Sequence, residues 1–177
     1  MDNPKSNFDF KLMALTYKFR DLFLPRMNIL KDIGIKPGSH VLDYGCGPGS
    51  YLTAAAELVG NSGKIYALDI HPLAIQIVQS IATKKQLTNV ETICSDCQTG
   101  LPDNSIDVVL LYDIFHDLSE PDKILGELHR VLKPRRGILS FSDHHMIEDE
   151  IVSKVTSSGL FKLSKTGERT FSFVKEG

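Results

Sequence analysis

Apolar residues recur along this chain with two different periods. Short runs rich in β-branched and aromatic residues stand at 40–42, 64–68, 90–93, 106–112 and 138–141. Between them, apolar residues return every three or four positions at 51–59, 72–87, 120–132 and 147–157. The first pattern is typical of strands and the second of amphipathic helices. Their alternation predicts an α/β fold, a doubly wound and mostly parallel sheet with helices on both faces.

Two details refine this fold. The run from Val108 to Leu111 lacks polar alternation, as expected of a central strand that is buried on both faces. From Gly159 onwards, two strands meet at a turn near Gly167 with no helix between them, so at least one of them is expected to be antiparallel to its neighbours. We therefore expect a Rossmann-like sheet of seven strands with an antiparallel hairpin strand at its C-terminal end.

Residues 8–33 form a helical pattern of their own ahead of the first strand. Pro25 is expected to start a second helix or to kink the first, because proline lacks the amide hydrogen that a helix interior needs. Apolar residues at helical spacing commonly form core. Here they are Phe8, Leu12, Leu15, Phe19, Leu22, Phe23, Met27, Leu30 and Ile33.

Composition and charge narrow the class of protein. At 177 residues the chain is expected to be a single domain, with an N-terminal helical segment at 1–36 and an α/β core at 37–177. The net charge of −2 gives no general electrostatic case for nucleic acid, and no apolar run approaches the length of a membrane span. The three cysteines, sparse and odd in number, fit a reducing cytoplasm.

A glycine-rich turn lies between the first strand and the following helix. From Asp43 to Ser50 it reads DYGCGPGS, and its alternate glycines let backbone N–H groups approach a ligand. Asp69 ends the second strand, twenty residues after Gly49. An acidic side chain at that strand end accepts hydrogen bonds from ribose hydroxyls. The sequence therefore predicts a nucleotide-like ligand at the carboxyl ends of the strands.

The glycine spacing and the acidic residues distinguish two classes of ligand. A dinucleotide fingerprint, G-x-G-x-x-G, would have its third glycine at position 50, where this chain has Ser50. The carboxylates of Asp43 and Asp96 would repel a pyrophosphate, whereas they would suit a ligand with positive groups and no phosphate. The pattern thus favours a cationic nucleoside over NAD.

This part of the sequence resembles class I S-adenosylmethionine-dependent methyltransferases. The resemblance rests on the glycine turn with its strand, Asp69, Ser95-Asp96, the strand 106–112, and the segment 132–139. It covers about residues 35–142 and is nearest to the small-molecule type that includes quinone and sterol methyltransferases. It implies S-adenosyl-L-methionine as the cofactor, bound by Asp43, Tyr44, Gly45, Cys46, Gly47, Gly49, Asp69, Ile70, Asp96, Cys97 and Tyr112.

The resemblance also implies roles for individual residues. The three glycines would pass under the methionine part of the cofactor, and Asp43 would hold its ammonium group, directly or through water or the turn's backbone. Asp69 would take the ribose, and Asp96 would accept from the adenine amino group. In related methyltransferases an N-terminal helical segment folds over the cofactor as a lid, for which the polar candidates here are Tyr17 and Arg20.

Candidates for the chemistry of methyl transfer stand after the fourth and fifth strands. A sulfonium methyl needs a nucleophile aligned behind it, and a base only where that nucleophile carries a proton. His116, Asp143 and His144 are candidates for this base, and His145 for a contact with the substrate or lid. Each of them could instead cap a helix or form a polar turn, and a metal site is not expected.

The sequence thus predicts methyl transfer from S-adenosylmethionine to an unidentified small-molecule acceptor, with no direct nucleic-acid partner. Two alternatives stay open. One is an NAD-dependent oxidoreductase, which Ser50 and the carboxylates disfavour. The other is a non-catalytic cofactor-binding module or partner subunit of a methyltransferase complex. A homodimer is also open, and the acceptor atom does not follow from these residues.

Overall fold

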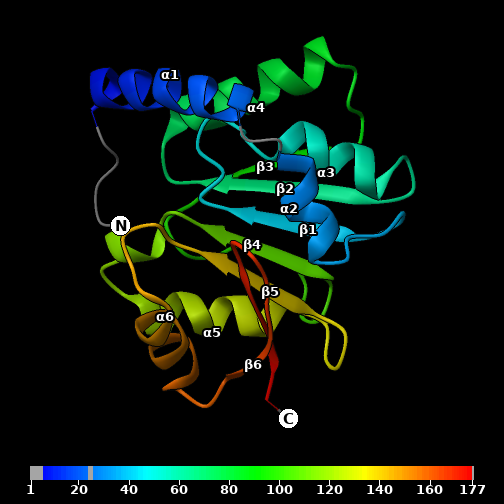
Figure 1. Ribbon diagram of the computed structural model, residues 1–177. Helices are drawn as coiled ribbons and strands as arrows, with labels where there is room; N and C mark the ends of the chain where they lie inside the picture. Colours follow the sequence, from blue (N-terminus) through cyan, green and yellow to red (C-terminus); the bar gives the residue numbers. More distant parts are fainter. Residues whose placement is uncertain (1–5, 24–25, 177) are drawn as a thin grey trace.

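The computed structural model describes residues 6–23 and 26–176, which build one seven-stranded sheet with helices on both faces (Figure 1). The strands are β1 (His40–Tyr44), β2 (Lys64–Asp69), β3 (Val90–Cys94), β4 (Val108–Tyr112), β5 (Ile138–Ser142), β6 (Phe161–Thr166) and β7 (Phe171–Lys175). They lie in the order β3-β2-β1-β4-β5-β7-β6. The pairs among β1 to β5 are parallel, and β7 is antiparallel to both β5 and β6. The predicted fold class is confirmed.

Two apolar cores sandwich the sheet. The helices are α1 (Asn7–Phe23), α2 (Arg26–Asp32), α3 (Leu52–Val59), α4 (Pro72–Lys84), α5 (Pro121–Val131) and α6 (Glu148–Thr156). Figure 1 shows α2, α3 and α4 on one side of the sheet and α5 and α6 on the other. Alternate strand residues enter opposite cores, so Val41 and Leu110 pack on the α3 side while Leu42 and Leu111 pack on the α5 side. None of the helices in the described ranges is long and apolar enough to cross a membrane.

The central strand is β4, as its uninterrupted apolar run indicated. All five of its residues are buried, and it pairs with β1 and β5. The predicted run from 106 to 112 begins two residues too early, because Ile106 forms an isolated bridge with Leu132 instead of joining the ladder. The predicted helix 72–87 likewise ends at Lys84, and His71 caps its start by accepting the Leu73 N–H at 3.1 Å.

The N-terminal pattern gives two helices, α1 and α2. Pro25 lies outside the described residues, as do the side chains of Leu22 and Phe23. The core interpretation is wrong for four residues of α1, whose side chains are 52–76% exposed: Phe8, Leu12, Leu15 and Phe19. α1 contacts the rest of the fold through its opposite side, where Phe10 is buried with its ring centroid 4.3 Å from that of His71. Leu30 and Ile33 are buried as predicted.

Candidate functional site

A cavity of about 540 Å³ lies beyond the carboxyl ends of β1, β2, β4 and β5. Ligands of open α/β sheets bind at this edge, where the strand order reverses between β1 and β4. One side, which we call the glycine wall, follows β1 and β2 and consists of Gly45, Gly47, Asp69, Ile70 and His71. The side after β4 and β5, the histidine wall, consists of Asp113, His116, Asp117, His144 and His145.

Helix α1 forms a third side of this cavity. It contributes one face to the lining, made of Phe10, Met13, Thr16, Tyr17 and Arg20. The guanidinium of Arg20 lies 4.0 Å from the centre of the Tyr17 ring. Both lid candidates of the N-terminal segment therefore face the cavity, and so does His145 from the histidine wall.

The glycine turn approaches the cavity with its backbone. The N–H groups of Gly45 and Cys46 donate to the Leu68 carbonyl at 2.8 and 2.9 Å, which ties the turn to β2. Gly45 and Gly47 have φ values of +78° and +50°, which glycine adopts without strain. A Cβ on Gly45 would collide with the Ile114 side chain, whereas one on Gly47 would meet no atom within 4 Å. Gly47 thus leaves space open at the cavity.

Asp69 is held rigidly by backbone donors. Its Oδ2 accepts from the Gly47 N–H and its Oδ1 from the His71 N–H, both at 2.8 Å. Burial raises the pKa of this carboxyl above its ordinary value, although these two bonds act in the opposite direction. Each carboxylate oxygen has capacity for a further hydrogen bond. Asp69 can therefore bind a donor pair such as two ribose hydroxyls.

Asp43 lies beside an adjoining cavity of about 30 Å³, lined also by Arg20, Ser50 and Tyr51. Its side chain is buried, and within residues 6–23 and 26–176 no cation forms an ion pair with it. Burial and, second, the charge of Asp69 raise the pKa of Asp43 to about 7. The Ser50 Oγ is buried without a hydrogen-bond partner. Buried carboxylates and hydroxyls are normally paired, so this end of the site suits a polar ligand that brings positive charge.

Four predicted cofactor residues do not line either of these cavities: Tyr44, Gly49, Asp96 and Cys97. The Tyr44 hydroxyl donates to the Asp96 carbonyl at 3.1 Å, and the Asp96 side chain is exposed. A Cβ on Gly49 would contact Val78 of α4, so this glycine permits close packing of α4. Of the other predicted contacts, Ile70 lines the large cavity, Cys46 the small one, and Tyr112 both.

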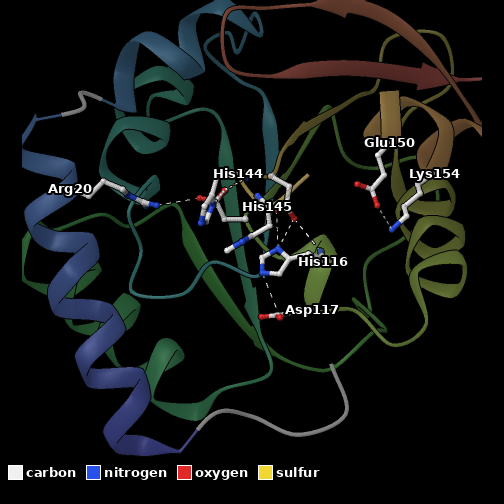
Figure 2. A network of polar contacts seen from close by, with 9 residues as sticks. Arg20, His116, Asp117, His144, His145, Glu150 and Lys154 are labelled. Carbon is white, nitrogen blue, oxygen red and sulfur yellow. Dashed lines mark hydrogen bonds and ion pairs between the residues drawn. The ribbon is translucent and has the colours of Figure 1, made fainter. Parts of the chain in front are cut away.

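His116, labelled in Figure 2, forms a hydrogen-bonded pair with Asp143. The His116 Nδ1 lies 2.8 Å from Oδ2 of Asp143, whose side chain is fully buried. Asp143 also accepts the backbone N–H groups of His116 and His145 at 3.1 and 3.0 Å. Burial alone would raise the pKa of Asp143, but the bonds from the His116 ring and these N–H groups hold it below its ordinary value.

The tautomer of His116 follows from this pair. A carboxylate accepts the proton of Nδ1, so Nε2 is left as the basic nitrogen. Nε2 lies 3.6 Å from Asp117 Oδ1, and both side chains line the cavity. The geometry is that of a cavity-lining histidine that is oriented by an acid at Nδ1, with its basic nitrogen near Asp117.

Asp113 is a site residue that the sequence predictions do not include. Its Oδ2 accepts from Arg20 Nη1 at 3.2 Å, and its Oδ1 lies 2.9 Å from His144 Nδ1. Asp113 has a φ of +54°, a conformation that aspartate tolerates better than most residues. The signal that points to it is its position directly after the central strand, where parallel sheets place ligand contacts.

Asp113, Asp143 and His144 offer ligand atoms within 4.8 Å of one another, close enough for a metal ion. Both oxygens of Asp143 are already hydrogen-bond acceptors for His116 and His145. The carboxylate of Asp113 is paired with Arg20 and His144. Hydrogen bonds therefore account for this cluster without a metal ion.

Curated proteins similar to this chain are methyltransferases of small molecules by name. Demethylmenaquinone methyltransferase from Geobacillus sp. (strain WCH70) is 32% identical over 118 residues, 66% of this chain and 48% of that protein. Aklanonic acid methyltransferase from Streptomyces sp. (strain C5) is 39% identical over 93 residues, 51% of this chain and 42% of that protein. The chain thus spans about half the length of these curated relatives.

Solved structures and a family model extend the comparison over most of the chain. A SAM dependent methyltransferase from Aquifex aeolicus has a TM-score of 0.75 at 29% identity, covering 90% of this chain and 96% of that chain. A protein from Methanococcus maripaludis has a TM-score of 0.80 at 17% identity, with coverage of 99% and 97%, which shows the shared fold alone. The model of a methyltransferase domain matches residues 35–170, a range that includes both walls of the cavity. The chain belongs to the class I S-adenosylmethionine-dependent methyltransferase family.

Proposed function

We propose that this chain transfers the methyl group of S-adenosylmethionine to a small-molecule acceptor. The observation that carries the proposal is the pair of buried carboxylates, Asp43 and Asp69, beside the unpartnered Ser50 hydroxyl. A ligand with ammonium and sulfonium groups compensates this negative charge, whereas the pyrophosphate of NAD would add to it. The names of the curated relatives support a small organic acceptor.

The residues of the glycine wall and of the adjoining small cavity would bind the cofactor by its polar groups. Asp43 accepts from the α-ammonium group, while Ser50 and Arg20, on the same small cavity, donate to the α-carboxylate. Asp69 accepts from the ribose hydroxyls with the lone pairs that Gly47 and His71 leave free. Bound in this way, the cofactor supplies a methyl group on a positively charged sulfur.

Helix α1 serves as a lid in this proposal. Its cavity face carries Phe10, which packs on His71, and Arg20, which pairs with Asp113 on the opposite wall. Through these contacts α1 lies along the cavity and lines one side of it. A lid excludes water from the reacting groups and holds the acceptor in line with the methyl group.

His116 would act as the general base, oriented by Asp143. The acceptor's lone pair would take the methyl group that the bound cofactor supplies, with the cofactor's sulfur as the leaving group. The acceptor's proton passes to Nε2 of His116 and from there to solvent. Asp143 stabilises the imidazolium through the bond at Nδ1.

Calorimetric titration with S-adenosylhomocysteine and with NADH tests the proposal. We expect S-adenosylhomocysteine to bind and NADH to give no heat of binding. Assays with radiolabelled methyl donor and a panel of phenols, hydroquinones and amines then search for the acceptor. Binding of NADH alone contradicts the proposal. Binding of S-adenosylhomocysteine without transfer to any acceptor of the panel would favour a cofactor-binding module.

A further inference from the structure

A single carboxylate connects the lid helix to the histidine wall. Oδ2 of Asp113 accepts from Arg20 of α1 at 3.2 Å, and Oδ1 accepts from His144, whose ring Nδ1 is 2.9 Å away and whose backbone N–H is 3.4 Å away. Arg20 and His144 are far apart in the sequence, but Figure 2 shows them pointing toward one another. Asp113 therefore links, by hydrogen bonds, two segments that are distant in the sequence.

The backbone of Asp113 is anchored, and the bonds to Arg20 and His144 hold its carboxylate. Its N–H donates to the Ser142 carbonyl at 2.7 Å, which anchors the end of β4 to the end of β5. Its left-handed conformation restricts the chain further. The side chain is only 18% exposed and that of Arg20 26%, so solvent screens this ion pair less than one on an open surface.

The two partners of Asp113 serve different parts of the site. Arg20 lines both cavities and is the partner that reaches the small one, beside Asp43 and Ser50, which His144 does not line. His144 lines the large cavity, with its ring centroid 4.0 Å from that of His145 and 6.3 Å from that of His116. A change at either partner alters the charge and the hydrogen bonds that Asp113 offers to the other.

We infer that Asp113 is a positioning residue that couples cofactor binding at Arg20 to the orientation of His144. This inference rests on the proposed function, in which the cofactor's carboxylate shares the Arg20 guanidinium. The guanidinium has five N–H donors and can bind two carboxylates at once. Its ion pair with Asp113 is then weaker, because it shares its charge with the cofactor's carboxylate. Coupling of binding free energies is reciprocal, so the state of His144 sets the cofactor affinity by the same factor.

Calorimetry with S-adenosylhomocysteine measures this coupling. His144 lies on the opposite wall from the residues proposed to bind the cofactor, yet we expect His144→Gln to change its affinity about fivefold. In the background of Asp113→Asn, which keeps a residue that tolerates the left-handed conformation, the same change at His144 has no further effect. Lys154→Gln is the matched control, because it removes a cation from the α6 pair with Glu150, which Figure 2 shows apart from the cavity residues.

Nuclear magnetic resonance measures the ring signals of His144. These signals would not respond to a change at Arg20 if Asp113 had a purely structural role. We expect Arg20→Gln to shift the ring signals of His144 in the ligand-free protein, and Asp113→Asn to abolish this response. The inference is overturned if Arg20→Gln leaves the His144 ring signals unchanged and His144→Gln leaves the affinity for S-adenosylhomocysteine unchanged. A protein that binds no S-adenosylhomocysteine refutes the proposed function instead, and the ligand-free ring signals still decide whether Asp113 couples the two residues.

Discussion

The glycine wall and the histidine wall face the same cavity but are built by different means. The glycine wall comes from one stretch, residues 45–71, and backbone N–H groups fix its acid, Asp69. The histidine wall joins residues 113–117 to residues 143–145 through bonds between side chains, such as His116 to Asp143. A backbone-built wall follows from local sequence, whereas a wall built from side chains exists only after two distant loops meet.

The two walls also differ in their balance of charge. On the glycine wall and its adjoining cavity, burial and then the charge of Asp69 raise the pKa of Asp43, so a cationic ligand would stabilise its ionised form. On the histidine wall, each described acid of the network has a basic partner, as in the pairs Arg20–Asp113 and His116–Asp143. We therefore expect substitutions on the first wall to change ligand affinity and those on the second to change the rate, except at His144, whose bond to Asp113 couples it to Arg20.

Replacement of His116 is expected to have the largest effect. His116→Gln should lower the methyl transfer rate about 10²–10⁴-fold, the usual contribution of a general base. The affinity for S-adenosylhomocysteine should stay within a factor of two or so of the wild-type value, because His116 belongs to the other wall. Steady-state kinetics with any acceptor found in the panel, together with calorimetry, check this. An equal loss in affinity and rate would contradict the division between the walls.

The second largest effect is expected from Asp69→Ala, on ligand affinity. Loss of a charged acceptor is expected to weaken S-adenosylhomocysteine binding by about 1.5–3 kcal/mol, measured by calorimetry. Asp96→Ala is the matched control, because Asp96 is exposed and does not line the cavity. If Asp96→Ala weakens binding equally, the cofactor extends past the described cavity to the predicted adenine contact. Unchanged affinity in Asp69→Ala would refute the ribose assignment.

The third effect is a pH dependence of ligand affinity, caused by the protonation of Asp43. With a pKa of about 7 in the ligand-free protein, Asp43 must lose a proton to hold an ammonium group. Affinity for S-adenosylhomocysteine should therefore rise about tenfold between pH 6 and pH 8, and Asp43→Asn should flatten this rise. A wild-type affinity that is flat over this range would show that Asp43 does not contact the ammonium group.

The same group affects the stability of the ligand-free protein with a definite sign. The folded pKa of about 7 lies above the ordinary value of 3.8, so between these values the folded state holds a proton that the unfolded state has lost. The stability from this proton is full below about pH 4 and is lost as the pH rises through 7. Urea titrations should show that Asp43→Asn loses less stability over this window than the wild type does.

The smallest expected effects are those of alanine substitutions at two glycines of the same turn, Gly49 and Gly47, which should differ in their effect on ligand affinity. Gly49→Ala places a Cβ against Val78 at 3.3 Å and in a left-handed conformation, which should cost about 1–2 kcal/mol of unfolding free energy. Its effect on S-adenosylhomocysteine affinity should be negligible, since Gly49 does not line the cavity. Gly47→Ala should lower both stability and affinity. Equal effects on affinity would show that Gly49 also contacts the ligand.

Much of the fold was predictable from sequence because it depends on local patterns. Each strand from β1 to β5 has a run of β-prone residues, and each helix that follows has its own apolar spacing. The outward face of α1 was not predictable in the same way. Phe8 and Leu12 have the spacing of a core stripe, but α1 meets the fold through the side that carries Phe10. Periodicity identifies a helix and does not decide which of two apolar faces is covered.

The site residues also divide into those that local sequence predicts and those whose contacts depend on tertiary structure. Asp43, Gly47 and Asp69 could be placed at the cavity because they end strands or lie in the turn between a strand and a helix. The bridge through Asp113 could not be foreseen, since it needs the register of β4 against β5 and the position of α1. The alignment of His116 Nδ1 with Asp143 is likewise a product of the two loops meeting.

The separation of the walls along the chain has a consequence for folding kinetics. The cavity closes only when β1 pairs with β4, across a sequence separation such as the 67 residues between His40 and Asp107. Pairing over such distances is a late and slow event compared with the formation of neighbouring strand–helix units. A ligand that needs both walls has no site before that event. S-adenosylhomocysteine should therefore slow unfolding of the native state while leaving the refolding rate of the denatured chain unchanged.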